Sequence, residues 1–277
     1  MSRRTPEYDR YQGSFHKAFE PELTRMIQHL KWIPQKQILD VPCGSGFYTG
    51  LLANRIREGQ HLTAIDNCEA YIRPLRDRLK EILQPNQFHV QSADAYHLPY
   101  DAESFDLIWC AESLISLDPK GALAEMHRLI SAVGQVVVYE VDEFHHVMLP
   151  WPVELEAALP AALLQATQAK YGSGTKHSPA RRLRKQLREA GFSHVRRRVH
   201  AFGRTAPFKN HTATYLKQHF DYLRQFAYPY LDSPLQDRFD RFTNYATADS
   251  IFQRPDAELT IMTALYTAEK TPRVVKP

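Results

Sequence analysis

The stretch QILDVPCGSGFYTG, residues 37–50, places a short apolar strand directly before a glycine turn and the start of a helix. Its first residues, QILDV, predict a buried strand with Asp40 near the carboxyl end. Gly44 and Gly46 supply a turn at which a ligand can approach bare backbone. Tyr48 to Arg57 then predicts the following helix. This order of strand, glycine turn and helix indicates a cradle for a nucleotide cofactor.

The spacing of the glycines favours one class of cofactor. A dinucleotide-binding fingerprint needs a third glycine three residues after the second, where the pyrophosphate meets the helix. Here Thr49 stands at that position, and the next glycine, Gly50, comes one residue late. A short Gly-x-Gly turn still suits a smaller ligand with a carboxylate and an adenosine. An oxidoreductase that binds NAD is therefore the weaker alternative.

Acidic residues follow two further predicted strands. HLTAI, residues 61–65, ends in Asp66, which lies 20 residues after Gly46 and leaves room for one intervening helix. At the carboxyl end of a neighbouring parallel strand, Asp66 can accept hydrogen bonds from both hydroxyls of a ribose. Asp94, in FHVQSADAYHLPY, could accept from an adenine amino group. FDLIWC and GQVVVYEV predict a fourth and a fifth strand.

Apolar residues between these strands recur at helical spacing. After the second strand they are Ile72, Leu75, Leu79, Ile82 and Leu83, and before the fifth they are Leu123, Met126 and Ile130. Alternation of strands with such helices predicts an α/β chain with a doubly wound sheet. We expect these stripes to belong to the core.

Several blocks together resemble the class I S-adenosylmethionine-dependent methyltransferases, in the small-molecule branch that includes quinone-biosynthesis methyltransferases. The blocks are ILDVPCGSGFYT, AIDNCEAYI, QSADAYHLPYDAESFDLIWC and EMHRLISAVGQVVVYE. Two departures stand out, because Pro42 replaces a glycine or small residue and Ala132-Val133 replace a usual Pro-Gly. Proline lacks an amide donor, so a hydrogen bond expected there must come from Gly44 or its neighbours.

The resemblance implies a seven-stranded Rossmann-like sheet of order 3-2-1-4-5-7-6, with the last strand antiparallel, and helical lid insertions. It implies S-adenosyl-L-methionine as the cofactor and a small molecule as the methyl acceptor. We assign the cofactor site to Asp40, Gly44, Gly46, Asp66, Asn67, Asp94, Ala95 and Cys110.

We expect one methyltransferase domain over residues 1–277, with an amino-terminal arm and helix over 1–36 and a cofactor-binding core over 37–141. Lid insertions on the substrate side are expected over 142–178 and 205–257, because both leave the sheet at the carboxyl ends of its strands. The second insertion is rich in aromatic residues, most of which we expect to form its own core. The arm, with Tyr8, Tyr11, Phe15 and His16, resembles the family's leading helix, which folds over the cofactor.

A general base is needed only if the acceptor must lose a proton, whether its nucleophile is oxygen, nitrogen or carbon. The candidates at the expected edge are Glu112 and the pair His145-His146, and the histidines are favoured because they accept a proton near neutral pH. No H-E-x-x-H or facial-triad pattern accompanies them, so we expect no metal.

Composition is that of a compact enzyme, with 35 Lys and Arg against 31 Asp and Glu. RNA as the substrate is an alternative, because arginines crowd residues 181–188 and 196–198, although the lid is balanced in charge. A non-catalytic scaffold protein that binds the cofactor is another alternative.

No apolar stretch is long enough to span a bilayer, and Cys43, Cys68 and Cys110 are too widely spaced for a zinc site or disulfides. We expect a cytoplasmic protein with no membrane insertion.

Overall fold

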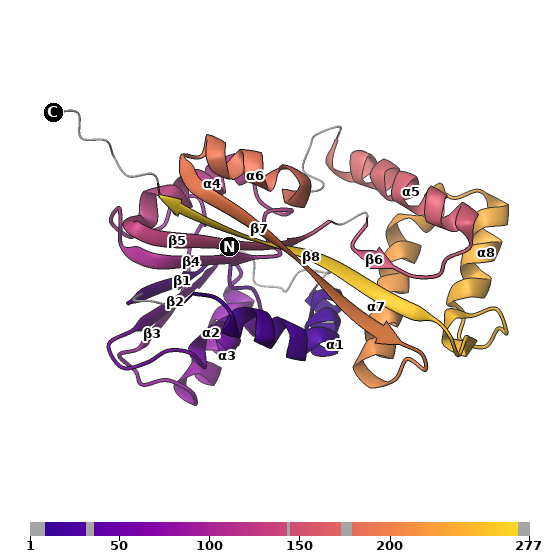
Figure 1. Ribbon diagram of the computed structural model, residues 1–277, viewed down its shortest axis with the longest axis horizontal. Coiled ribbons are helices and arrows are strands. Elements are labelled where there is room, and N and C mark those ends of the chain that lie inside the picture. Colours follow the sequence, from indigo (N-terminus) through magenta and orange to yellow (C-terminus); the bar gives the residue numbers. More distant parts are fainter. Residues whose placement is uncertain (1–8, 32–35, 143–144, 173–178, 271–277) are drawn as a thin grey trace.

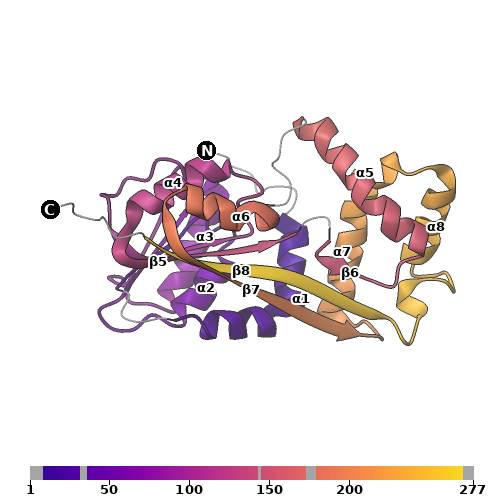
Figure 2. The ribbon, with the colours of Figure 1, turned by 45° about the horizontal axis from the view of Figure 1, so that its top comes forward.

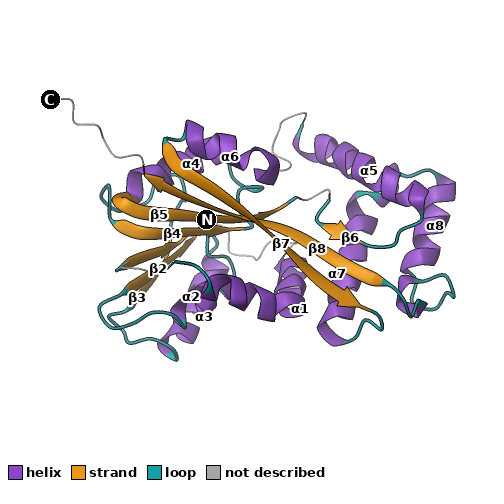
Figure 3. Ribbon diagram, viewed as in Figure 1, coloured by secondary structure: helices purple, strands orange, loops and turns teal. Residues whose placement is uncertain are grey.

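The computed structural model describes residues 9–31, 36–142, 145–172 and 179–270. Tyr8, named above, lies outside them. Within them helices and strands alternate along the first half of the chain, as Figure 3 shows by colour. The elements are α1 (Asp9–Gln28), β1 (Gln37–Asp40), α2 (Phe47–Ala53), β2 (His61–Asp66), α3 (Glu69–Lys80), β3 (Phe88–Ser92), β4 (Phe105–Ala111), α4 (Pro119–Leu129), β5 (Ile130–Val141), β6 (Val147–Met148), α5 (Val153–Tyr171), α6 (Pro179–Glu189), β7 (Phe192–Thr205), α7 (Asn210–Phe226), η1 (Tyr228–Tyr230), α8 (Ser233–Thr243), η2 (Ile251–Gln253) and β8 (Glu258–Lys270).

The sheet has the strand order β3-β2-β1-β4-β5-β8, and β7 pairs with the other edge of β8. β1 to β5 run parallel, whereas β8 is antiparallel to both β5 and β7. With β8 counted as the seventh strand and β7 as the sixth, this confirms the predicted order 3-2-1-4-5-7-6. The sequence did not indicate β6, a strand of two residues that pairs with β8 at Ile261 and Thr260.

β7 and β8 are longer than the strands of the core and form a ribbon that leaves it. Their pairing runs from Phe192 opposite Lys270 to Thr205 opposite Glu258, whereas β5 pairs with β8 only from Thr263 onward. The far half of the ribbon therefore projects toward α5, α7 and α8 (Figure 1 and Figure 2). The second insertion starts and ends at the tip of this ribbon.

Hydrophobic residues from the two faces of the sheet form two cores. One core, which includes Ile38 and Trp109, holds α1, α2, α3 and the helices of the insertions. The other, which includes Leu39 and Cys110, lies against α4 and α6. Successive residues of a strand point to opposite faces, so neighbours such as Ile38 and Leu39 enter different cores. A sheet covered on both faces explains why its central strands are uninterrupted apolar runs.

The insertions pack on each other and form what we call the cap, which comprises α5, η1, α7, α8 and η2. Trp151, just before α5, joins them, since its ring centroid lies 4.4 Å from that of Phe242 and 5.6 Å from that of Phe220. Five of the aromatic residues of the second insertion are buried, namely Phe208, Tyr215, Phe220, Phe239 and Phe242. Tyr230 and Tyr245 are exposed. With Tyr222, Phe226, Tyr228 and Phe252, which are partly buried and pack against the same hydrophobic core, the five buried residues account for most of the aromatic residues of this insertion, as expected.

Helix α1 bridges the sheet and the cap. It kinks at Phe19, whose φ of −121° is not helical, two residues before Pro21, and proline disfavours helical geometry around it. Arg204 of β7 holds the kinked region, because its guanidinium donates to Glu22 Oε1 at 2.6 Å and to the Ala18 carbonyl at 2.7 Å. The amino-terminal half of α1 is thereby fixed beside α7.

Three local predictions were wrong. Helix α2 ends at Ala53, not Arg57, before a turn in which Gly59 has a φ of +77°. Helix α3 ends at Lys80, so Ile82 leaves the apolar stripe and 40% of it is exposed. Helix α4 ends at Leu129, so Ile130 begins β5 and does not continue the helical stripe. All three errors lie at helix ends, where apolar spacing can continue past the last hydrogen-bonded turn.

Candidate active site

The glycine turn after β1 is held by backbone hydrogen bonds from both neighbouring strands. Val41 N donates to Trp109 O of β4 at 2.9 Å, and Cys43 N donates to Ile65 O of β2 at 2.8 Å. Gly46 N then closes the turn on Cys43 O at 2.9 Å. The turn therefore has a fixed place at the carboxyl ends of β1, β2 and β4.

Its two glycines are required for different reasons. Both have positive φ, +53° at Gly44 and +79° at Gly46, which L-residues with a side chain rarely adopt. A methyl group on Gly46 would meet Leu75 and the guanidinium of Arg78, which also donates to Gly46 O. A methyl group on Gly44 would meet no atom within 4 Å. Gly46 thus allows α3 to pack closely, while Gly44 has an open side that a ligand could approach.

Asp66, at the end of β2, lies against this turn. Its Oδ2 accepts from Gly44 N at 2.8 Å and its Oδ1 accepts from Cys68 N at 2.9 Å. Burial raises the pKa of the carboxyl group, and the backbone amides that donate to it oppose that rise. Asn67, the next residue, is exposed. The predicted ribose acceptor and the predicted turn are thus brought together across two strands.

Asp40 and Cys110 are buried and inaccessible to solvent. Asp40 is 1% exposed and accepts a hydrogen bond from Thr49 Oγ1 at 2.6 Å. Burial raises its pKa to about 7, while the bond from Thr49 acts in the opposite direction. Cys110 is fully buried in the core beside α4 and α6. In this conformation neither residue presents an exposed atom to a ligand, and Asp40 serves to anchor α2 to the end of β1.

Asp94 follows β3 and keeps an exposed carboxylate. Its Oδ1 accepts from Tyr96 N at 3.0 Å, and its Oδ2 lies 4.0 Å from His97 Nδ1. The side chain of Asp94 is 61% exposed, and Ala95 beside it is half-buried. Asp94 therefore retains acceptor capacity for a ligand.

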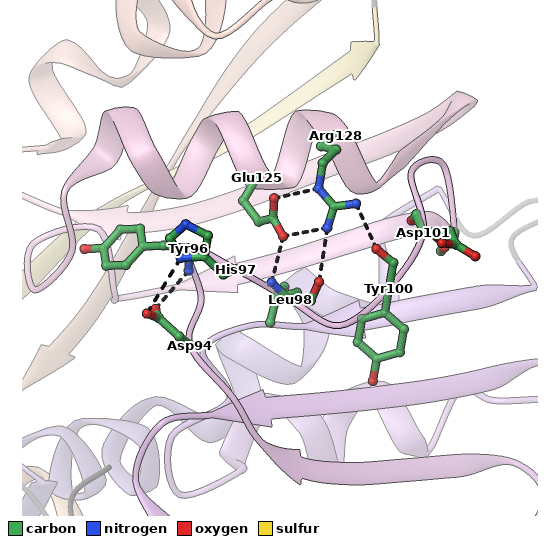
Figure 4. Close-up of polar contacts among 9 residues, drawn as sticks. Asp94, Tyr96, His97, Leu98, Tyr100, Asp101, Glu125 and Arg128 are labelled. Carbon is green, nitrogen blue, oxygen red and sulfur yellow. Dashed lines mark hydrogen bonds and ion pairs between the residues drawn. The ribbon is translucent and has the colours of Figure 1, made fainter.

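Helix α4 clamps the loop that carries Asp94 (Figure 4). Glu125 Oε1 accepts from Leu98 N at 2.8 Å, and Arg128 donates to the carbonyl of Tyr100 at 2.8 Å. Glu125 and Arg128 also pair with each other at 2.7 Å, which lowers the pKa of the carboxyl group. This bidentate clamp fixes the loop after β3 relative to the sheet.

Glu112 is the centre of a buried polar cluster directly after β4. Its Oε2 contacts Gln12 Nε2 at 2.8 Å and His16 Nε2 at 3.0 Å, and its Oε1 accepts from Tyr48 OH at 2.8 Å. Burial acts to raise the pKa of Glu112, but His16 and the three hydrogen bonds prevail and lower it. The backbone of Glu112 has a φ of +51°, which is uncommon for a residue with a side chain.

Aromatic rings surround this cluster. The ring of His16 stacks on Phe47, the first residue of α2, with centroids 4.2 Å apart and planes 8° from parallel. Tyr48 lies 5.4 Å from Trp109 and 5.8 Å from Tyr139 between ring centroids. In the part of the chain that the structure describes, Trp109 Nε1 is buried with no hydrogen-bond partner. Such an orphaned donor is costly unless a ligand or water meets it.

The predicted histidine pair separates. His145 is exposed, whereas His146 is buried and its Nδ1 lies 2.9 Å from Asp142 O. Nε2 of His146 lies 3.4 Å from Tyr11 OH, which is also 3.0 Å from His219 Nδ1. His146 therefore belongs to a second polar cluster, between α1 and α7 of the cap.

Two members of this second cluster, His219 and Tyr215, are neutral near pH 7. Burial, together with the smaller effect of the nearby His146, lowers the pKa of His219 to about 3. Tyr215 OH, 3.4 Å from Tyr11 OH, has its pKa raised by burial. These two side chains can donate and accept hydrogen bonds without placing a charge in the boundary between sheet and cap.

Sequence reasoning missed the partners of both clusters. His16 and Glu112 are 96 residues apart, and Tyr11 and His219 are 208 residues apart. The family resemblance did imply that Tyr11 and His16 lie on an arm that folds over the cofactor, and this was the one available signal. Among the described residues, no group of three or more His, Cys, Asp or Glu is arranged to hold a metal ion. No described helix has the length and apolar character needed to cross a bilayer.

Comparison with known proteins supports the methyltransferase resemblance. Residues 38–134 match a family model described as a methyltransferase domain. Methyltransferase GfsG of Streptomyces halstedii is 30% identical over 45% of this chain and 45% of its own. Demethylmenaquinone methyltransferase of Listeria monocytogenes is 26% identical over 69% of this chain and 92% of its own. The crystal structure of YcgJ from Bacillus subtilis, at 13% identity, has a TM-score of 0.58 over 91% of this chain and 99% of that one.

The extent of these matches differs. The chain spans less than half the length of GfsG and of O-methyltransferase cnsE of Penicillium expansum, 45% and 40% respectively. The segment matched by the family model contains the glycine turn, Asp66, Asp94 and Glu112. The chain therefore carries a methyltransferase domain and has the fold of the class I S-adenosylmethionine-dependent methyltransferases.

Proposed function

We propose that this protein transfers a methyl group from S-adenosyl-L-methionine to an oxygen, nitrogen or carbon atom of a small, partly apolar molecule. The observation that carries the proposal is the contact of Asp66 with the amide of Gly44, 2.8 Å long, at the carboxyl ends of adjacent strands. It joins an acidic ribose acceptor to an open glycine turn, and these are the two elements that a nucleoside with a carboxylate tail requires.

The residues suit this cofactor. Asp66 accepts hydrogen bonds from the amides of Gly44 and Cys68, and the amide of Asn67 also stabilises its charge; a carboxylate offers about four acceptor positions, so acceptor capacity for the ribose remains. The open side of Gly44 admits the methionine end. The exposed carboxylate of Asp94 would accept from the adenine amino group. Asn67 and Ala95 directly follow Asp66 and Asp94 in the sequence, and the proposed site includes both.

A small acceptor is supported by the surroundings of the site. Helix α1 and the cap adjoin the carboxyl edge of the sheet, and the boundary between them is lined by Tyr11, Tyr215 and Tyr222, whose rings stack. Such a boundary suits a ring or an apolar chain with one or two polar atoms. When bound, the cofactor supplies an already activated methyl group, so the protein mainly positions the acceptor and excludes water.

Thermal unfolding with added ligands tests the cofactor. A ligand at 100 times its dissociation constant adds about 2.7 kcal/mol to the free energy of unfolding. We expect S-adenosylmethionine and S-adenosylhomocysteine to raise the unfolding temperature, and NAD and NADP to leave it unchanged. Stabilisation by a nicotinamide dinucleotide would refute the proposal in favour of an oxidoreductase.

Two alternatives have their own tests. RNA as the acceptor is favoured by the exposed Arg196, Arg197 and Arg198 on β7, although charge at a sheet edge also blocks edge-to-edge pairing. Transfer of a tritiated methyl group to RNA, and to no small molecule, would establish it. A scaffold that binds the cofactor would label neither RNA nor a small molecule in a single turnover.

The three cysteines are free and buried, as suits a protein of a reducing compartment, and the proposal therefore includes a cytoplasmic location.

A further inference from the structure

Among the described residues, the pair formed by His16 and Glu112 is the acid–base group best placed beside the glycine turn. Glu112 directly follows β4, beside the glycine turn, and Tyr48 ties it to α2, which begins at the end of that turn. The ring of His16 lies flat on Phe47, one residue after Gly46. A methyl group carried by a cofactor on this turn would therefore be close to both side chains.

The hydrogen bond between the two residues determines which nitrogen of His16 is free. An ionised carboxylate only accepts hydrogen bonds, so His16 Nε2 must carry the proton that it shares with Glu112 Oε2 at 3.0 Å. In the neutral ring Nδ1 is then the nitrogen with a lone pair. Nδ1 has no hydrogen-bond partner within the described segments, and only 7% of the side chain is exposed.

We propose that His16 is the proton acceptor of the methyl-transfer reaction and that Glu112 is the residue that positions it. The inference rests on the proposed function and narrows it to acceptors that lose a proton, namely a phenol, an enol or another acidic hydroxyl group. The acceptor oxygen forms the new O–C bond, the electrons of the broken C–S bond stay on sulfur, and the hydroxyl proton moves to His16 Nδ1.

The surroundings of His16 indicate that it acts as a base and does more than hold α1 in place. Glu112 is held by Gln12 and Tyr48 as well as by His16, so its position does not depend on the histidine. Its positive φ is a strained conformation of the kind that gathers at functional sites. The orphaned indole N–H of Trp109, on the ring beside Tyr48, could meet a polar atom of a ligand. His146, by contrast, faces Tyr11 and the carbonyl of Asp142.

Nitrogen NMR of histidine-labelled protein, saturated with S-adenosylhomocysteine, tests the tautomer without any substrate. The signal of His16 is assigned by its loss in His16→Gln, a variant whose amide can still donate to Glu112. Besides Glu112, the titratable groups that face this region in the described segments are the phenols of Tyr48, Tyr139 and Tyr215, whose pKa values burial raises. They stay neutral over the range in which a histidine titrates.

We expect neutral His16 to carry its proton on Nε2 and to gain the second proton on Nδ1. In Glu112→Gln the side-chain amide can either accept from His16 Nε2 or donate to it, so the tautomer protonated on Nδ1 should become populated. A neutral ring protonated on Nδ1 in the wild type, or the same ratio of tautomers in Glu112→Gln, would overturn the inference. If S-adenosylhomocysteine fails to bind the wild-type protein, the proposed function itself fails, which calorimetry shows separately.

Kinetics with tritiated S-adenosylmethionine and a panel of phenols, enols, tertiary amines and thioethers gives the second test. We expect only phenols or enols to be labelled, and His16→Gln to lower kcat by about 10² to 10⁴ with the affinity for S-adenosylhomocysteine kept. His89→Gln, at an exposed histidine of β3, is the matched control and should behave as wild type. Labelling of a tertiary amine or thioether, or full activity of His16→Gln, would contradict the proposal.

Discussion

Replacing each turn glycine by alanine separates folding of the turn from ligand binding by it. Gly44 and Gly46 have φ of +53° and +79°, and left-handed backbone costs an L-residue about 1–2 kcal/mol. Alanine also restricts the unfolded chain, which offsets about 0.4–1 kcal/mol of that cost. The new methyl group of Gly44→Ala would meet no atom within 4 Å. We therefore expect Gly44→Ala to lower the free energy of unfolding by about 1 kcal/mol.

Gly46→Ala should cost more. Its methyl group would collide with Leu75 Cδ1 and lie 2.6 Å from Arg78 Nη2, and overpacking typically adds about 1–3 kcal/mol. The expected total is about 2–4 kcal/mol. Urea unfolding, followed by the fluorescence of the three tryptophans, measures both variants. Equal destabilisation of the two would refute the argument that α3 packs against Gly46.

For binding of the cofactor we expect the opposite order, with the larger effect at Gly44. A methyl group on Gly44 would project into the open side of the turn, so Gly44→Ala should weaken binding of S-adenosylmethionine by roughly tenfold or more, about 1.4 kcal/mol. Isothermal calorimetry at a temperature where the variant is folded measures the change. Unchanged affinity would show that the open side of Gly44 does not face the ligand.

Three further substitutions test individual side chains. Asp66→Asn keeps the shape but removes the charge, and should weaken calorimetric binding of S-adenosylmethionine by at least about tenfold, since charge-assisted hydrogen bonds contribute about 1.5–3 kcal/mol; equal affinity would exclude the ribose assignment. The pKa of Asp40 is raised from 3.8 to about 7, so as pH rises the unfolded chain loses this proton before the folded chain does, and the free energy of unfolding falls between about pH 4 and about pH 7. Asp40→Asn should remove that fall, which amounts to up to about 4 kcal/mol, as measured by urea unfolding. An unaltered pH dependence would contradict this prediction. The pKa of His219 is lowered from 6.5 to about 3, so its contribution is present above about pH 6.5 and lost as pH falls through about 3; His219→Asn should make the protein less sensitive to acid, and the same acid midpoint as wild type would count against a buried neutral histidine.

The sequence predicted those features in which the interacting residues are close along the chain or repeat with a fixed period. The strand before Gly44, the acid 20 residues after Gly46 and the apolar stripe of α3 all belong to this kind. Such patterns record which face of an element is buried. The end of the stripe was wrong at Ile82, because apolar spacing does not record where the helix stops.

The sheet order came from the resemblance, and the structure confirmed it. Neither source indicated β6, because two residues carry too little pattern to define a strand. The burial of Asp40 and Cys110 could not be predicted from the sequence either. Both follow apolar neighbours near a strand end, but only packing of α2, α4 and α6 on the sheet decides that they are enclosed.

By itself the sequence determined the α/β class, the glycine turn and the acids that follow β2 and β3, because these depend on local backbone preferences and on the period of burial. Only the tertiary structure decided which side chains meet across the chain. The kink at Phe19 and the clamp of Arg204 on Glu22 set the direction of α1, and that direction brings His16 to Glu112 and Tyr11 to His219. Contacts between residues so far apart depend on the packing of whole helices, which no local pattern of residues encodes.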